Sequence, residues 1–129
     1  MASTIDTLTV DCADPGVVGR FWAEALGWRT VDQGDGDVEI ADPAGRDRPI
    51  LFQMVPEAKV VKNRWHLDLR PTTSMADEIT RLVAAGASIL ERIDEHGNFW
   101  TVLLDPEDNE FCVLRGPEDG WSPDVRGSA

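Results

Sequence analysis

The sequence contains no tyrosine and few cysteine, histidine or basic residues. It has 2 Cys, 2 His and 12 Lys+Arg against 24 Asp+Glu, a formal net charge of −12. Without tyrosine, no phenol is available as a general acid. The excess negative charge repels nucleic-acid phosphates and anionic lipid, so we expect neither nucleic acid nor a membrane as a partner. No stretch reaches the roughly 20 apolar residues of a membrane span.

Several motifs with well-defined chemistry are also missing. No Ser/His/Asp order around a nucleophile elbow and no glycine-rich phosphate loop is visible. Residues 1–10 show no charged segment followed by an apolar one, so we expect no signal peptide and a cytoplasmic location. In that compartment Cys12 and Cys112 are expected to be buried, reduced thiols rather than a disulfide.

The first half of the chain has the pattern of a strand, a helix and three further strands. Alternating β-formers predict a strand over residues 5–12. Asp14 and Pro15 suit a helix start, an apolar helical face follows, and Gly27 suits the helix end. Further strands are predicted over 28–32, 38–41 and 50–55, which gives the order β-α-β-β-β.

The second half repeats this order after a polar linker over residues 56–63. A strand is predicted over 65–69, helix caps at 72–74, a helix end at Gly86, and strands over 88–93, 99–104 and 110–115. Asp42-Pro43 of the first half recurs as Asp105-Pro106. Residues 117–129 are expected to be a loose polar tail, in which Trp121 is a candidate anchor for a second subunit.

This repeat predicts an α+β fold of two βαβββ modules, about 5–55 and 64–116, within a single domain over 1–129. One such module buries little surface alone, so we expect the two to form one curved sheet around a cavity, with helices outside. Gly27 and Gly86 should be equivalent helix ends with positive φ.

A resemblance to a known family rests on five segments spread over almost the whole chain. They are 11–15 (DCADP), 20–28 (RFWAEALGW), 51–53 (LFQ), 63–69 (NRWHLDL) and 105–114 (DPEDNEFCVL). In order and spacing the chain resembles the vicinal oxygen chelate superfamily, which includes glyoxalases, bleomycin-resistance proteins and extradiol dioxygenases. Within it, the chain is similar to small bacterial glyoxalase-like proteins. The resemblance implies paired βαβββ modules around an open cavity and leaves the reaction open.

Alternation along the strands predicts which polar residues face this cavity. A plain core would exclude such groups, because burying an unpaired polar group costs about 1–3 kcal/mol. The expected cavity residues are Thr7, Thr9, Asp11, Gln53, His66, Asp68, Arg70 and Glu110. Asp11 and Arg70 take equivalent places in the two halves. One expectation is that they form an ion pair across the module junction. The other is that Arg70 instead binds a substrate carboxylate.

The resemblance also implies a candidate metal pair, His66 and Glu110, at the ligand positions of the second module. Such a pair suits a divalent Zn, Fe, Mn or Ni ion. In the first module Thr7 and Gln53 stand where stronger ligands are usual, so weak metal binding is one expectation. The other is a hydrogen-bonded polar pair with no metal. Neither cysteine is expected on the face of His66, which argues against a site with a thiolate ligand.

Two functions remain open at this point. The first is a protein that binds a small-molecule ligand in the cavity between its modules without obligatory metal. The second is a metal-dependent lyase, isomerase or dioxygenase that acts on a substrate with vicinal oxygens through His66 and Glu110. A purely structural module would leave the inward polar set unexplained. Two small modules leave exposed sheet edges and apolar surface, and members of the family that the chain resembles often cover their cavities with a second subunit. We therefore expect a homodimer.

Overall fold

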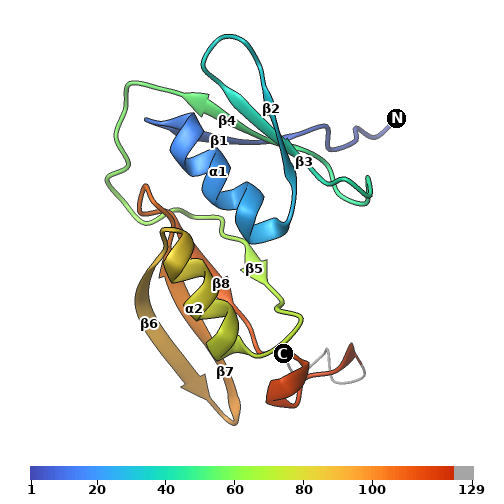
Figure 1. Ribbon diagram of the computed structural model, residues 1–129, viewed down its shortest axis with the longest axis vertical. Coiled ribbons are helices and arrows are strands. Elements are labelled where there is room, and N and C mark those ends of the chain that lie inside the picture. Colours follow the sequence, from blue (N-terminus) through green and yellow to red (C-terminus); the bar gives the residue numbers. More distant parts are fainter. Residues whose placement is uncertain (124–129) are drawn as a thin grey trace. The chain divides into compact units, whose positions relative to one another are not determined.

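The computed structural model describes residues 1–123 and divides the chain into two compact units, Met1–Val60 and Val61–Ala129. Each unit contains one four-stranded sheet and one α-helix (Figure 1). Within the described residues, no helix combines the length and apolar character that crossing a bilayer requires. Two α+β modules of the predicted kind are therefore confirmed.

The first unit follows the predicted element order. It consists of β1 (Leu8–Cys12), α1 (Pro15–Leu26), β2 (Arg29–Asp32), β3 (Val38–Ala41) and β4 (Ile50–Met54). The sheet has the order β1-β4-β3-β2, with β1 parallel to β4 and the other pairs antiparallel. The helix packs on β2, β3 and β4. Buried side chains from the helix and the sheet form the core, among them Val18, Phe21, Trp22, Ile40 and Phe52.

The ends of α1 lie where the sequence predicts them. The Asp14 carboxylate accepts a hydrogen bond from the Val17 N–H at 3.1 Å, and Pro15 opens the helix. Gly27 ends it at φ 69°, in the left-handed region that favours glycine. In the second unit Ser74 caps the helix through the Asp77 N–H, and Gly86 ends it at φ 127°. Both predicted helix-end glycines are thus confirmed.

The second unit repeats the arrangement. Its elements are β5 (Asp68–Leu69), α2 (Met75–Ala85), β6 (Ser88–Glu95), β7 (Asn98–Leu104), β8 (Glu110–Val113) and a short 3-10 helix, η1 (Pro117–Asp119). The sheet order is β5-β8-β7-β6, with β5 parallel to β8. Because β5 makes only two ladder pairs with β8, it is shorter than the strand predicted over 65–69.

A buried aspartate shapes the same turn in both units. The Asp42 carboxylate, between β3 and β4, accepts from the Ala44 and Arg46 N–H groups. Asp105, between β7 and β8, accepts from the Glu107 and Asn109 N–H groups. The hydrogen bond from Ala44 is the largest effect that lowers the pKa of the Asp42 carboxyl. The recurrence of Asp-Pro in the sequence therefore reflects one repeated turn.

The predicted loose tail is wrong for residues 117–123. One oxygen of the Asp119 carboxylate accepts from the Met75 N–H at 2.7 Å and from the Gly116 N–H at 2.9 Å. These bonds fix η1 against the start of α2. The half-buried Trp121 ring lies 4.0 Å from the Arg70 guanidinium of the same chain, so it is not the fully exposed anchor that a loose tail would present. The rest of the predicted tail, 124–129, lies outside the described residues.

Candidate functional site

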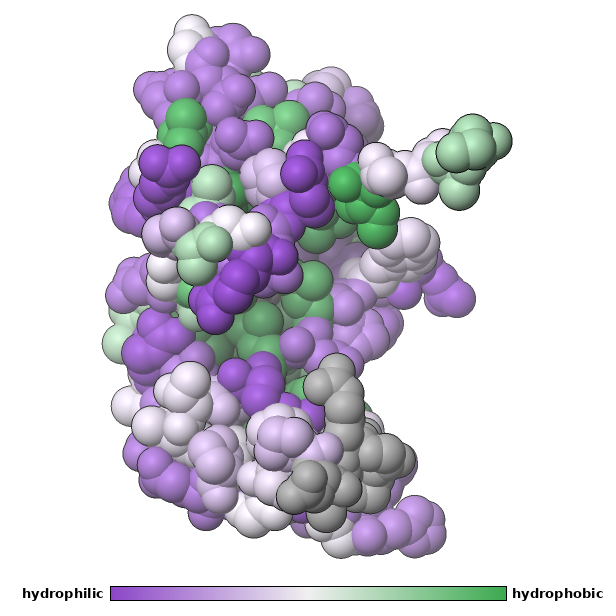
Figure 2. Space-filling view, turned by 90° about the vertical axis from the view of Figure 1, so that its right-hand side faces the viewer, coloured by the Kyte–Doolittle hydropathy of each residue, from purple (hydrophilic) through white to green (hydrophobic). Residues whose placement is uncertain are grey.

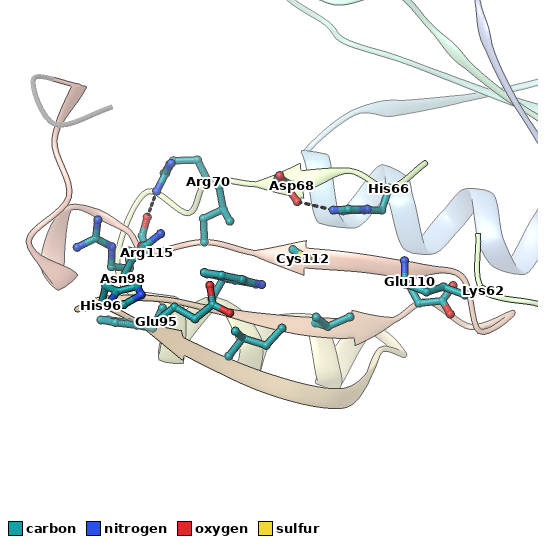
Figure 3. A pocket seen from close by; sticks show the side chains of 15 residues that line it. Lys62, His66, Asp68, Arg70, Glu95, His96, Asn98, Glu110, Cys112 and Arg115 are labelled. Atoms are coloured by element: carbon teal, nitrogen blue, oxygen red, sulfur yellow. Dashed lines mark hydrogen bonds and ion pairs between the residues drawn. The ribbon is translucent and has the colours of Figure 1, made fainter. Parts of the chain in front are cut away.

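A pocket of about 920 Å³ lies on one face of the second unit's sheet (Figure 3). The opposite face belongs to α2: Thr101 contacts Met75 of that helix, and its alternate neighbour Leu103 is fully buried. The side chains between them in the alternation point to the pocket, as strand geometry requires. The lining residues are Lys62, His66, Asp68, Arg70, Ile93, Glu95, His96, Asn98, Phe99, Trp100, Val102, Glu110, Cys112, Leu114 and Arg115.

Four of the eight predicted cavity residues line this pocket together: His66, Asp68, Arg70 and Glu110. The other four belong to the first unit. There, Gln53 and Asp11 are register partners on β4 and β1, and the Gln53 amide donates to the Asp11 carboxylate at 3.3 Å. That all eight residues share one cavity stays a prediction, as does the pairing of Asp11 with Arg70.

One region of the pocket gathers an imidazole, a carboxylate and a thiol. His66 Nε2 lies 3.2 Å from Asp68 Oδ1, and the ligating atoms of His66, Asp68 and Cys112 all lie within 4.8 Å of one another. His66 lies two residues before Asp68, which is the first residue of β5. Asp68 is the register partner of Cys112 on the parallel strand β8. The expectation that neither cysteine shares the face of His66 is therefore wrong.

The Cys112 thiol is strongly influenced by its surroundings. Burial, followed by the negative charge of Asp68 and a hydrogen bond with it, raises the pKa of Cys112 to about 11. The thiol is consequently protonated at neutral pH. Both cysteines are free and buried, as the sequence predicts.

Glu110 lies near Lys62, in the same region of the pocket as His66 (Figure 3). The backbone of Asn63 binds the Glu110 side chain, and the side chain of Asn63 binds the Glu110 backbone. The Asn63 N–H donates to Glu110 Oε1 at 3.1 Å, and the Asn63 side chain accepts from the Glu110 N–H at 2.7 Å while donating to the Glu110 carbonyl at 3.2 Å. Sequence reasoning placed Asn63 in a polar linker and missed this clamp.

Arginine side chains gather in a second region of the pocket (Figure 3). Arg70 donates to the Arg115 carbonyl at 2.7 Å and stacks on Trp121. The Arg115 guanidinium lies 5.8 Å from the Phe99 ring, and its Nε–H is buried with no hydrogen-bond partner among the described residues. Sequence reasoning missed Arg115 because the strand predicted over 110–115 puts it on the face opposite Glu110, whereas β8 ends at Val113 and alternation does not extend to Arg115. His96, expected to be a solvated loop residue, is exposed and also lines the pocket.

The residues that the family resemblance offers as metal ligands fit a divalent ion only in part. His66 and Glu110 supply good donors. The Thr7 hydroxyl donates to Asp6, and Gln53 offers a neutral amide that donates to Asp11. Among residues 1–123, the group of three ligating side chains with close-set atoms is instead His66, Asp68 and Cys112.

Comparison with known proteins identifies the family. A model described as a glyoxalase-like domain matches residues 7–114. The chain belongs to this family. The resemblance to the vicinal oxygen chelate superfamily is thereby confirmed, and no curated protein matches the glyoxalase-like chain.

Solved structures share the fold at low sequence identity. The hypothetical protein SA1046 from S. aureus has a TM-score of 0.69 at 15% identity, covering 89% of this chain and 95% of its own. A glyoxalase/bleomycin resistance protein/dioxygenase family enzyme from Burkholderia phytofirmans has a TM-score of 0.67 at 17%, covering 84% and 94%. The fosfomycin resistance protein FosX from Listeria monocytogenes has a TM-score of 0.69 at 13%, covering 98% and 99%. At these identities the likeness shows the fold alone.

Proposed function

We propose that this glyoxalase-like domain binds a small organic carboxylate in the pocket of its second unit, without requiring a metal. The observation that carries the proposal is the buried, unpartnered Arg115 Nε–H. A buried donor without an acceptor costs about 1–3 kcal/mol, which a ligand oxygen would recover. Guanidinium groups also match the planar geometry of a carboxylate.

The remaining pocket wall suits the apolar body of such a ligand. Its apolar lining residues are Ile93, Phe99, Trp100, Val102 and Leu114. Apolar walls with a few placed polar groups are the usual composition of small-molecule sites. Two of the structural relatives are named for resistance to bleomycin or fosfomycin, which is consistent with a binding role for this fold.

Binding of a panel of aromatic and aliphatic carboxylates, followed by tryptophan fluorescence and calorimetry after chelator treatment, tests the proposal. Arg115→Met should weaken the best ligand by about 10- to 100-fold, which corresponds to one charge-assisted hydrogen bond. Arg92→Met is the matched control, because Arg92 also stacks on Phe99, at 4.6 Å, but does not line the pocket. Equal losses in both variants, or no saturable binding by any carboxylate, would refute it.

A second candidate is the metal-dependent lyase, isomerase or dioxygenase. The observation that favours it is that His66 and Glu110 line the same pocket. A bound ion would polarise a substrate oxygen as a Lewis acid. Ligand binding that disappears after chelation and returns on adding Zn²⁺, Fe²⁺, Mn²⁺ or Ni²⁺ would favour this candidate over the first.

We also propose a homodimer in the cytoplasm. Hydrophilic residues cover most of the face in Figure 2, interrupted by smaller hydrophobic patches. On the edge strand β6, Ile89 and Leu90 are 59% and 55% exposed, which is a surface that association would cover. Two free cysteines suit a reducing compartment. Light scattering at high micromolar concentration should give the mass of two chains, and a monomer there would contradict the dimer.

A further inference from the structure

Acidic and basic side chains line the pocket of the second unit in equal number, although the whole chain carries a formal net charge of −12. Apart from two histidines, the charged lining residues are the basic Lys62, Arg70 and Arg115 and the acidic Asp68, Glu95 and Glu110. Equal numbers suit a ligand with one charge of each sign. We propose that the pocket binds an extended zwitterion, in which an apolar chain separates a carboxylate from a primary ammonium group. This inference rests on the carboxylate site proposed above at Arg115 and adds an ammonium site at Asp68.

The ammonium end of the ligand fits the row of register partners Asp68, Cys112 and Val102, which crosses the sheet. The Asp68 side chain is 52% exposed and lines the pocket. Its Oδ1 lies 3.2 Å from His66 Nε2, and a carboxylate has lone pairs for further donors. Burial and then the negative charge of Asp68 raise the pKa of the Cys112 thiol, and the positive charge of Lys62 lowers it by less. The electrostatic field at this row is therefore negative, which favours a cation.

The carboxylate end of the ligand fits Arg115, which follows Cys112 by three residues. The Leu114 N–H donates to the Leu69 carbonyl at 2.9 Å, so the chain stays bonded to its neighbour beyond the end of β8. At about 3.3 Å per residue, the backbone of Arg115 lies about 10 Å along the strand from that of Cys112. Figure 3 shows Arg115 at one end of the pocket and Glu110 at the other. An α-amino acid, whose two charged groups share one carbon, is too short to reach both sites.

Strand register places apolar side chains between the two charged ends. Trp100 lies two residues before Val102 on β7, which runs antiparallel to β8, so it is displaced from the row of Cys112 toward Arg115. Leu114 lies two residues after Cys112 and is displaced in the same direction. Both side chains line the pocket. A methylene chain that joins the charged groups would therefore contact Trp100 and Leu114 and bury apolar surface.

Ligands that share a carboxylate and differ at the other end test the inference. Hexanoate, 6-aminohexanoate and adipate end respectively in a methyl group, an ammonium group and a second carboxylate. Binding to the chelator-treated full chain is measured by tryptophan fluorescence and calorimetry. 6-Aminohexanoate should bind about 3- to 10-fold more tightly than hexanoate, the gain from a partly exposed charge-assisted hydrogen bond. Adipate should bind more weakly than hexanoate, and glycine should bind no more tightly than acetate.

Two matched variants test the role of Asp68. Asp68→Asn should bind 6-aminohexanoate and hexanoate with equal affinity, because it removes the charge that attracts the ammonium group. Asp94→Asn is the control, since it removes the same charge from an exposed residue of the same unit that does not line the pocket. It should keep the preference for 6-aminohexanoate. In the unaltered protein, added salt should reduce this preference, a result that requires no variant to fold.

The outcomes separate this inference from the proposed function on which it rests. Equal affinities of the unaltered protein for 6-aminohexanoate and hexanoate, tighter binding of adipate, or a preference that survives in Asp68→Asn would overturn the ammonium site alone. The same holds if 6-aminohexanoate fails to bind while another carboxylate binds at Arg115. If no carboxylate binds the unaltered protein, the carboxylate site and the ammonium site are both overturned.

Discussion

Replacing Asp119 with alanine should destabilise the second unit by about 2 kcal/mol. One oxygen of this carboxylate accepts from the backbone N–H of Met75, at the start of α2, and from that of Gly116. The Met75 N–H is among the donors of a helix start that no backbone carbonyl of the helix can satisfy. Removing the Asp119 carboxylate therefore leaves the Met75 N–H without this acceptor in a half-buried place.

The magnitude follows from the two hydrogen bonds. Bonds to a charged group contribute about 1.5–3 kcal/mol each when buried, and removing a single helix cap costs about 0.5–2 kcal/mol. Asp119 is half-buried and Ser74 still caps the helix through the Asp77 N–H, so water recovers part of the loss. About 2 kcal/mol lies between these limits.

Urea unfolding followed by circular dichroism measures the effect. Glu118→Ala is the control, since it removes the same charge from the neighbouring exposed residue and leaves the backbone bond from the Glu118 N–H to Thr73 in place. It should change stability by less than about 0.5 kcal/mol. Equal stability of the two variants would show that residues 117–123 do not hold α2, and the reasoning would fail.

Two other predictions concern a helix end and the pocket thiol. Gly27→Val should lower stability by about 1–2 kcal/mol because of its φ of 69°, while Gly16→Ala, with no crowding in the same helix, should raise it by about 0.5–1 kcal/mol. Thermal denaturation measures both, and a Gly27→Val protein as stable as the unaltered chain would contradict the first. In a Cys12→Ser background, Cys112 should react with iodoacetamide at pH 8 about 100-fold more slowly than an ordinary thiol, because its pKa near 11 reduces the thiolate fraction, and the rate should rise with pH up to that value. Reaction at the ordinary rate would contradict the second.

Local signals in the sequence predicted much of the fold. The helix ends depend on Asp14, Gly27, Ser74 and Gly86, whose effects act over a few residues, and each lies where the sequence places it. Such caps can be predicted from the sequence because each capping group bonds a residue that is near it in the chain. Alternation likewise brought four of the predicted polar residues to one pocket.

Contacts between segments that are far apart in the chain could not be predicted from the sequence. Asn63 clamps Glu110, and Asp119 caps α2, although the partners in each pair are far apart in the chain. Neither Asn63 nor Asp119 belongs to a periodic pattern, so composition classified both as parts of polar, irregular segments. Their roles depend on which segments the fold brings together.

Strand register explains the difference between the two units, whereas the error over Cys112 needed only alternation, because Cys112 lies two residues after Glu110 on β8 and therefore on the same face. Counting from the buried turn aspartates Asp42 and Asp105, the strand pair Glu39–Leu51 corresponds to Val102–Cys112. Leu51 therefore takes the place of Cys112 in the first unit.

The parallel pairs agree with this correspondence, because Thr9 faces Leu51 and Asp68 faces Cys112. The same scaffold thus presents a hydroxyl and an alkyl group in one unit, and a carboxylate and a thiol in the other. Alternation alone gives the face of each side chain, but only the register between the first and last strands says which side chains meet. The close-set imidazole, carboxylate and thiol at this position therefore depend on the side chains of the second unit and not on the backbone arrangement that both units share.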